Sequence, residues 1–450
     1  MSTPVRVYGG WRERRGFGIG SLSGRQTAFG LVAVLMVLLC LMMVPRALPL
    51  LAVPVGLALA AVFTRVRGES LLSITSRHAQ WQRAKSRGRT SYNATQTPEL
   101  PGVLAQVSMI AEDGYVVLYD KPRRTLTALV PVEPQGVTFA TADEITDWMK
   151  RWGGWLSHLG YVPNVAHVVV TVHTAPGPAD VSDDEPAEGL AADVMRDLRA
   201  LSVSRCVART VVSVTVHTGG SDVPAAVQRL QEVLSSLETL NTCGVTVLEA
   251  MSDHDVTQWV RSCYDPSLDH GTNGQWLDAR PTAAVEQWDN YRHDSGISAA
   301  FMWDECPGDG LSAHTLNRLL GPANYVKRVS MVFEPISAHV AAREVDRQAE
   351  AASFRSEYRR RLGRDETARE RLDIQKARQT AHEQASGSGL VDVGLYAVVT
   401  ARGEQDLESC AADLHNRAGE ARIRLRRAYG AQAQSFAATL GLGYLPRHGW

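Results

Sequence analysis

The stretch QTAFGLVAVLMVLLCLMMVPRALPLLAVPVGLALAAVFT (Gln26–Thr64) is almost wholly apolar and is interrupted once, at Pro45-Arg46. The interruption divides it into runs of about 20 and about 18 residues, each close to the length with which a helix crosses the hydrocarbon core of a bilayer. A signal peptide has a shorter apolar region, which is not followed at once by a second one. The sequence therefore predicts a two-helix transmembrane hairpin.

Positive charge surrounds this hairpin but hardly enters it. Arg46 is the one cation between the two apolar runs. The flanks carry many cations, namely Arg6, Arg12, Arg14, Arg15 and Arg25 before the hairpin and Arg65, Arg67, Arg77, Arg83, Lys85, Arg87 and Arg89 after it. Because basic flanks stay on the cytoplasmic side, we expect a multi-pass protein of the inner (cytoplasmic) cell membrane with both termini in the cytoplasm. The basic residues beside the hairpin predict contact with the lipid bilayer, and direct contact with DNA is left open.

The overall composition argues against two classes of protein. The 450 residues carry a formal net charge of −1, so they lack the broad basic field of a general nucleic-acid-binding protein. The six cysteines are scattered and form no Cys-x-x-Cys pair. This distribution speaks against a disulfide framework and against a structural zinc site.

Outward from the hairpin, composition and periodicity divide the chain into segments. The predicted segments are a basic cytoplasmic lead-in (1–25), the hairpin (26–64), a basic juxtamembrane linker (65–101), a small β subdomain (102–140), an α/β body (141–335), a charged helical arm (336–389), and a C-terminal βαβ unit with a helical tail (390–450).

The α/β body alternates between helical and strand-like patterns. Thr141 and Glu144 predict a capping box at the start of its first helix, and we expect the tryptophans of that helix, Trp148, Trp152 and Trp155, in the core or at a subunit seam. Repeated helix–strand units of this length predict ferredoxin-like βαβ units. The predicted fold class is a two-helix transmembrane hairpin followed by a cytoplasmic α/β (α+β) body with ferredoxin-like βαβ units, a small β-meander and a long charged helical arm.

Two motifs are candidates for chemistry. Asp253-His254-Asp255 follows a strand-like run, and its carboxylates would suit a divalent cation with a nucleotide-sugar diphosphate, as in a glycosyltransferase. The alternative, which we favour, is that Ser252 and Asp253 cap the following helix. His293-Asp294 resembles half of a metal-dependent phosphohydrolase motif, but partner histidines do not accompany it.

Common catalytic signatures are absent from the sequence. No lysine follows a glycine, so the Gly-Lys-Ser/Thr of a phosphate-binding loop is missing and ATP hydrolysis by such a loop is not predicted. The chain also contains no HExxH and no GxSxG. We therefore predict no catalytic, cofactor-binding or metal-ligating residues, no cofactor, and a protein that is not an enzyme.

The order of the parts resembles a known family. YGGWRERRGFG (8–18) precedes the hairpin, YVVLYDKPRRTLTALVPV (115–132) follows it, and the chain closes on LVDVGLYAVVTARGEQDLESCAADLHNRAG (390–419) and IRLRRAYGAQAQSFAATLGLG (423–443). This layout is similar to an actinobacterial conjugation-element membrane protein family, in which a PrgI-like membrane hairpin is joined to a region resembling the N-terminal, ATPase-free part of the type IV secretion conjugation ATPase. The most specific part is FAATLGLG (Phe436–Gly443), here named the closing passage. In the ATPase family a similar passage leads into the motor domain, with proline where Gly441 stands.

The resemblance implies a role and no catalytic residues. The chain would be an inner-membrane scaffold component of an integrative conjugative element, within a type IV-like transfer apparatus, and would dock a separate conjugation ATPase and other transfer-channel proteins. Small residues such as Gly30 and Gly56 in the apolar runs are compatible with a homo-oligomer. Two alternatives stay open: an EccE-like membrane component of type VII secretion, and a membrane-tethered glycosyltransferase-like enzyme with Asp253 and Asp255 as metal ligands.

Overall fold

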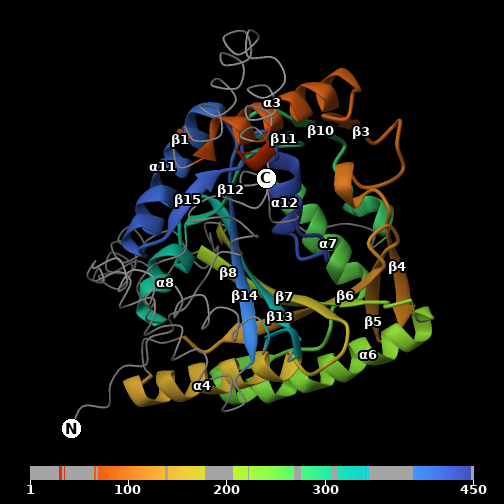
Figure 1. Cartoon of the computed structure of the whole chain (residues 1–450), viewed down its shortest axis with the longest axis vertical. Coiled ribbons are helices and arrows are strands. Elements are labelled where there is room, and N and C mark those ends of the chain that lie inside the picture. Colours follow the sequence, from red (N-terminus) through yellow and green to blue (C-terminus); the bar gives the residue numbers. More distant parts are fainter. Residues whose placement is uncertain are drawn as a thin grey trace, which may run out of the picture.

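The computed structural model describes residues 30–32, 35, 65–66, 69–112, 114–136, 140–177, 206–220, 222–267, 275–305, 313–337, 339–341, 343 and 389–446. Within these ranges, thirteen strands form one sheet in which every paired ladder is antiparallel (Figure 1). The strands follow the order β3-β10-β11-β12-β14-β13-β7-β8-β6-β5-β4, with β15 beside β12 and β9 beside β6. A separate pair, β1 (Arg65–Val66) and β2 (Glu69–Ser70), precedes α3 (Leu71–Ser86) and β3 (Ser91–Asn93).

After β3 and the short helix η2 (Gly102–Leu104), the elements fall into two successive sets. The first set is β4 (Val107–Glu112), β5 (Tyr115–Asp120), β6 (Thr125–Pro134), α4 (Ala142–Leu159), β7 (Val165–Pro176), β8 (Cys206–His217), α6 (Val223–Ser236), η3 (Leu237–Cys243), β9 (Val245–Val247) and α7 (Asp253–Tyr264). Helix η4 (Trp276–Ala279) then leads to the second set, β10 (Ala283–Glu286), β11 (Tyr291–His293), β12 (Gly296–Glu305), α8 (Ala313–Leu320), β13 (Val326–Ile336), β14 (Leu390–Ala401), α11 (Glu404–Glu420), β15 (Arg424–Arg427) and α12 (Gln432–Ala438).

Both sets have the same topology. In the first, β6-α4-β7-β8-α6-β9 lies in the spatial order β9-β6-β8-β7, and in the second, β12-α8-β13-β14-α11-β15 lies in the order β15-β12-β14-β13. This is the ferredoxin-like arrangement, in which each helix connects two strands that flank a third. A hairpin precedes each unit and a helix follows it. The two units join edge to edge through β7 and β13, so the body is a tandem repeat.

Hydrogen bonds at equivalent positions support the repeat. The Thr127 and Thr215 hydroxyls lie 2.9 Å apart across β6 and β8. The Ser298 and Thr400 hydroxyls lie 2.8 Å apart across β12 and β14, which are the counterpart strands. At the seam itself, Thr171 of β7 and Ser330 of β13 are register partners, and their hydroxyls lie 2.7 Å apart. The two units are therefore related by an approximate twofold axis near this central pair.

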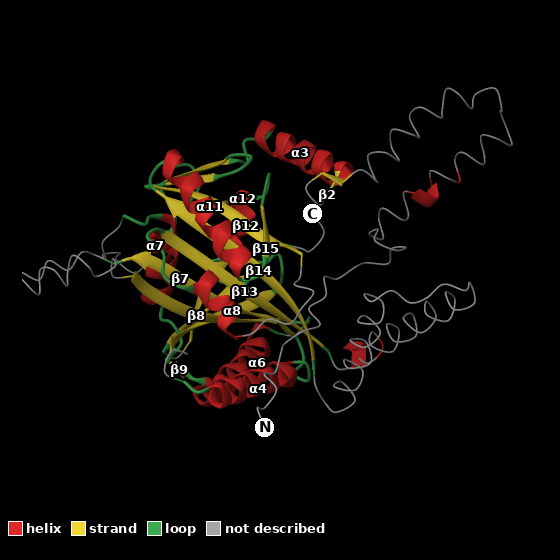
Figure 2. Ribbon diagram, turned by 90° about the vertical axis from the view of Figure 1, so that its left-hand side faces the viewer, coloured by secondary structure: helices red, strands yellow, loops and turns green. Residues whose placement is uncertain are grey.

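Helices cover both faces of the sheet. On one face, α4 and α6 bury Leu156 and Leu230 against the first unit, and α11 buries Leu407 and Leu414 against the second, with α8 beside it. Figure 2 shows α4 and α6 together at one end of the sheet, with α11 farther along it. On the opposite face, α7 and α12 pack together with the closing passage and the segment before β4. That face draws residues from both units into one core.

The predicted fold class was wrong in its main statement. The body is a large, wholly antiparallel sheet within the described residues, and the β-meander expected as a separate subdomain is continuous with it through β6 and β8. The alternation of helix and strand was interpreted as repeated βαβ units of a separate α/β body. It arises instead because each crossover, such as α4 between β6 and β7, passes over an intervening antiparallel strand, β8.

The predicted membrane location is also corrected. No helix in the described part of the chain is both long enough and apolar enough to span a bilayer. The longest of them, α4, carries Asp147, Lys150 and Arg151 and buries only one face. A multi-pass, inner-membrane location is therefore not retained. The hairpin predicted at 26–64 lies outside the described residues except for 30–32 and 35, and the charged arm predicted at 336–389 lies outside them except for 336–337, 339–341, 343 and 389.

Local predictions for the first helix are confirmed. The Thr141 side chain accepts a hydrogen bond from the Glu144 backbone N–H, and the Glu144 carboxylate accepts one from the Thr141 N–H at 2.7 Å. Trp155 is buried and donates through Nε1 to Ser236 Oγ at 3.0 Å. Trp152 stacks on Trp155 with ring centroids 5.3 Å apart. Trp152 and Trp155 thus pack in the core of the first unit.

Candidate functional site

The acidic motif Asp253-His254-Asp255 begins helix α7 and caps it. The Ser252 hydroxyl accepts from the Asp255 backbone N–H at 3.3 Å, and the Asp255 carboxylate accepts from the Ser252 N–H at 3.1 Å. The favoured prediction of a helix cap is confirmed for Ser252; its capping partner is Asp255, and Asp253 lies in the first turn. Within the described ranges, no group of three or more histidine, cysteine or acidic side chains is placed to hold a metal ion, so this motif is not joined by further ligands there.

His293 and Asp294, the second candidate motif, take separate structural roles. Asp294 has a left-handed φ of 37° in the two-residue turn between β11 and β12. Its carboxylate accepts from the Thr282 N–H at 2.8 Å and from Arg261 Nη1 at 2.5 Å. Asp265 at the end of α7 also pairs with Arg261, at 3.3 Å. These contacts fasten the end of α7 to the hairpin of the second unit.

His293 itself is fully buried and is bonded through both ring nitrogens. Nδ1 lies 2.5 Å from the Tyr264 carbonyl, and Nε2 lies 2.7 Å from Ser298 Oγ. Because a carbonyl oxygen can only accept, the neutral ring carries its proton on Nδ1 and accepts the Ser298 hydroxyl proton at Nε2. Burial lowers the pKa of His293 to about 4.

A serine bonded to a histidine is also the geometry of an activated nucleophile. Here, however, both side chains are 0% exposed. The Ser298 hydroxyl is further engaged with Thr400. The described residues alone thus bury Ser298 away from any substrate atom, and the pair instead connects α7, β11, β12 and β14.

Arg328 is the second unusual buried group. It is 1% exposed, and its guanidinium donates to the Cys263 carbonyl at 3.4 Å and to Thr439 Oγ1 at 3.3 Å, above the Phe436 ring at 4.5 Å. A cation suits the last turn of α7, where carbonyl groups are unpaired and the helix dipole is negative. Within the described part of the chain, its Nη2 atom has no hydrogen-bond partner.

Arg328 stands beside the seam opposite His173, its register partner. On the other side of the central Thr171–Ser330 pair, the counterpart partners are Val169 and Val332. One side of the approximate twofold axis is therefore apolar and the other is cationic. Burial, together with the cations Arg328 and Arg209, lowers the pKa of His173 to about 3.

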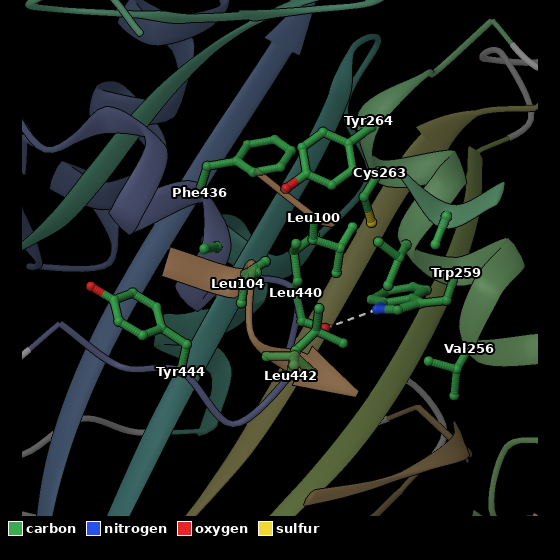
Figure 3. Packing of buried hydrophobic residues seen from close by; sticks show 14 of the residues in the cluster. Leu100, Leu104, Val256, Trp259, Cys263, Tyr264, Phe436, Leu440, Leu442 and Tyr444 are labelled. Atoms are coloured by element: carbon green, nitrogen blue, oxygen red, sulfur yellow. Dashed lines mark hydrogen bonds between the residues drawn. The ribbon is translucent and has the colours of Figure 1, made fainter. Parts of the chain in front are cut away.

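These groups surround the closing passage, which lies in the centre of the shared core (Figure 3). Phe436, Leu440 and Leu442 are each at most 1% exposed. Trp259 of α7 donates through Nε1 to the Leu440 carbonyl at 2.9 Å. Gly441 has a φ of 73°, which proline cannot adopt because its ring fixes φ near −65°. The departure from the family pattern at this position therefore has a conformational basis in this chain.

We expect Trp259→Phe to lower the free energy of unfolding by about 1–3 kcal/mol, because the buried Leu440 carbonyl loses its donor. Equilibrium denaturation in urea measures the change. Trp276→Phe is the matched control, since Trp276 donates to the Val107 carbonyl at 3.3 Å in a half-buried position. The control should lose clearly less free energy of unfolding. Equal losses in the two variants would contradict the role given to the Trp259 hydrogen bond.

Sequence reasoning missed the cationic side of the seam. The signal lay in the spacing, because His167, Thr171 and His173 share one face of β7, and the strand VKRVSMVFEPI carries Lys327 and Arg328 in an otherwise apolar run. Lys327 points to the opposite face, where its ammonium donates to the Leu319 and Gly321 carbonyls at the end of α8. Burial lowers the pKa of Lys327 to about 8.

No protein-family model matches this sequence, and no curated protein matches it. The resemblance to the conjugation family thus rests on the quoted residues and stays a prediction.

Proposed function

We propose that this protein is a non-catalytic docking component of a conjugative, type IV-like transfer apparatus, in which it binds a separate ATPase. The observation that carries the proposal is the position of the closing passage. In the family that it resembles, such a passage connects the ATPase-free region to the motor. Here Phe436 and Leu440 are buried among residues of both repeat units, which supports a body that folds as a counterpart of that ATPase-free region.

The use of the polar side chains is in line with this proposal. His293 and Ser298 bond each other in the core, Asp255 caps α7, and Arg328 binds the end of the same helix. These four side chains hold secondary structure in place. A rigid platform for a partner protein needs such fixed packing and no reacting group.

The test is recovery of the partner from cells. Full-length protein with an affinity tag is cross-linked in its host during DNA transfer, purified and analysed by mass spectrometry. We expect enrichment of an ATPase with a phosphate-binding loop, relative to a tagged protein of similar abundance. The reciprocal purification through a tag on that ATPase should return this chain. Recovery of transfer proteins without any ATPase, or of neither, at normal protein levels would overturn the proposal.

A further inference from the structure

The surface around α3 combines exposed cations with a row of aromatic rings. Arg83, Lys85, Arg87 and Arg89 are all exposed, and residues 71–98 contain no Asp or Glu. The end of this basic stretch is anchored, because the Thr90 carbonyl accepts from the Glu286 N–H at 2.7 Å where β3 pairs with β10. The cations therefore stand at a fixed place along one edge of the sheet.

The aromatic row begins on α3 and continues on the body of the second unit. The rings of His78 and Trp81 lie 4.9 and 5.6 Å from that of Trp288, in the turn between β10 and β11. Trp288 in turn stacks on Tyr429, at 6.2 Å. Lys85 Nζ lies 5.1 Å from the Trp81 ring. Trp81, Trp288 and Tyr429 are only half-buried, so the row reaches the surface beside the cations.

Packing of α3 on the body explains part of this row but not its surroundings. The neighbouring carboxylates face inward or are already bonded: Glu286 accepts from the Ala433 N–H at 3.0 Å, and Asp289 from Asn290 Nδ2 at 3.1 Å. Among the described residues, the geometry places exposed positive charge next to half-buried aromatic rings.

We propose that this surface, defined by Trp81, Arg83, Lys85, Arg87, Arg89, Trp288 and Tyr429, binds single-stranded nucleic acid. Cations that follow a phosphate backbone, next to aromatic rings on which bases stack, are the shared chemistry of sequence-tolerant single-strand binding. A lipid surface would also account for cations beside aromatic rings, and the vesicle arm of the test below distinguishes it from a nucleic acid. A duplex would account for phosphate contact but keeps its bases away from the rings. This inference does not depend on the proposed ATPase partner.

The test measures binding of a fluorescent oligothymidylate of about 15 nucleotides, a length that spans a typical single-strand site, to the purified full-length protein by anisotropy. Converting Arg83, Lys85, Arg87 and Arg89 together to Gln should weaken binding about tenfold or more at low salt. It should also reduce the slope of log K against log salt by about 3, because each phosphate contact to a single strand contributes roughly 0.7. The matched control converts Lys121, Lys150, Arg151 and Arg402, which are exposed elsewhere, and should retain wild-type affinity.

Two further arms separate the sources of binding. Cross-linking with an iodouracil-substituted oligonucleotide should map to peptides containing Trp81, Trp288 or Tyr429. A duplex of the same length should bind more weakly. Equal loss in the test and control variants, cross-links confined to other regions, equal affinity for duplex, or binding to phosphatidylglycerol vesicles but not to the oligonucleotide would each overturn the proposal. Co-purification of an ATPase would be unaffected by any of these results.

Discussion

Gly443→Ala is expected to destabilise the protein by about 3 kcal/mol or more. A Cβ atom at this position would lie 2.1 Å from Thr127 Oγ1 and 3.4 Å from Thr215 Oγ1, both in the buried hydroxyl pair of the first unit. The backbone φ of Gly443 is 82°, and a left-handed conformation costs a residue with a side chain about 1–2 kcal/mol. Overpacking of a well-filled core adds about 1–3 kcal/mol. Chemical denaturation of the purified variant measures the sum.

Gly220→Ala separates the backbone effect from the clash. Gly220 has a similar φ of 77°, but among the described residues nothing lies within 4 Å of the position that an alanine methyl group would take. In this control the free energy of unfolding should decrease by only about 1–2 kcal/mol, which is the cost of the left-handed backbone conformation for alanine. The double variant Thr127→Ala/Gly443→Ala should regain part of the lost stability, because the closest atom is removed. If Gly220→Ala and Gly443→Ala lose equal amounts, the close approach of the closing passage to the sheet is not what requires glycine.

The closing passage also shows how a sequence pattern and a conformation can diverge. At Gly441, where the family that the passage was predicted to resemble has proline, the φ of 73° is incompatible with proline. Gly441 and Gly443 both have a left-handed backbone conformation, and because they lack a Cβ atom the backbone can lie close to the side chains of Ser213 and Thr127. The sequence indicated the passage, but only the structure shows that it is an internal element of the core.

The long strands could be predicted from the sequence because their residue patterns are strong. β7, β8, β13 and β14 are each 11 or 12 residues long and are rich in β-branched and apolar residues. The pieces β3, β10 and β11 were missed because they span only three or four residues, too few to show an alternation of buried and exposed positions. These short strands are where α3 and the aromatic row are attached.

The tandem repeat was hidden from sequence reasoning by the unequal connections between its parts. β7 and β8 are separated by residues 177–205, whereas β13 and β14 are separated by residues 337–389. Equivalent pairs such as Thr127–Thr215 and Ser298–Thr400 consequently stand at different spacings along the chain. A helix-then-strand pattern also does not reveal whether a crossover returns to an adjacent strand, so the order of the strands in the sheet could not be predicted from it.

The candidate site was only partly predictable for a related reason. His293-Asp294 was noticed as a pair, but neighbours along a strand point to opposite faces. The structure accordingly places His293 in the core and Asp294 in a turn. The partners that give His293 its role, Tyr264 and Ser298, come from other elements. Such convergence depends on the sheet order, which the sequence did not reveal.

The stability of the protein is expected to fall steeply between pH 7.5 and pH 5. Burial lowers the pKa of His167 to about 4, of His173 to about 3 and of His293 to about 4, from an ordinary value of 6.5. Below pH 6.5 the unfolded chain therefore binds protons that the folded protein does not, and stability is lost as the pH decreases. The full stability is present above pH 6.5. At pH 5 each of the three histidines lowers the free energy of unfolding by about 2 kcal/mol, since one pKa unit corresponds to about 1.4 kcal/mol.

His173→Val isolates one of these contributions. Valine is the residue that the counterpart position, Val332, carries on the apolar side of the seam, so the variant should remain folded at pH 7.5. The free energy of unfolding is measured by urea denaturation at pH 7.5 and at pH 5. Its decrease between the two pH values should be about 2 kcal/mol smaller in the variant than in the wild type. If folded His173→Val has the same pH dependence as the wild type, His173 binds its proton as readily in the native protein as in the unfolded chain. That result would contradict the lowered pKa, which rests on burial and on the cations around His173.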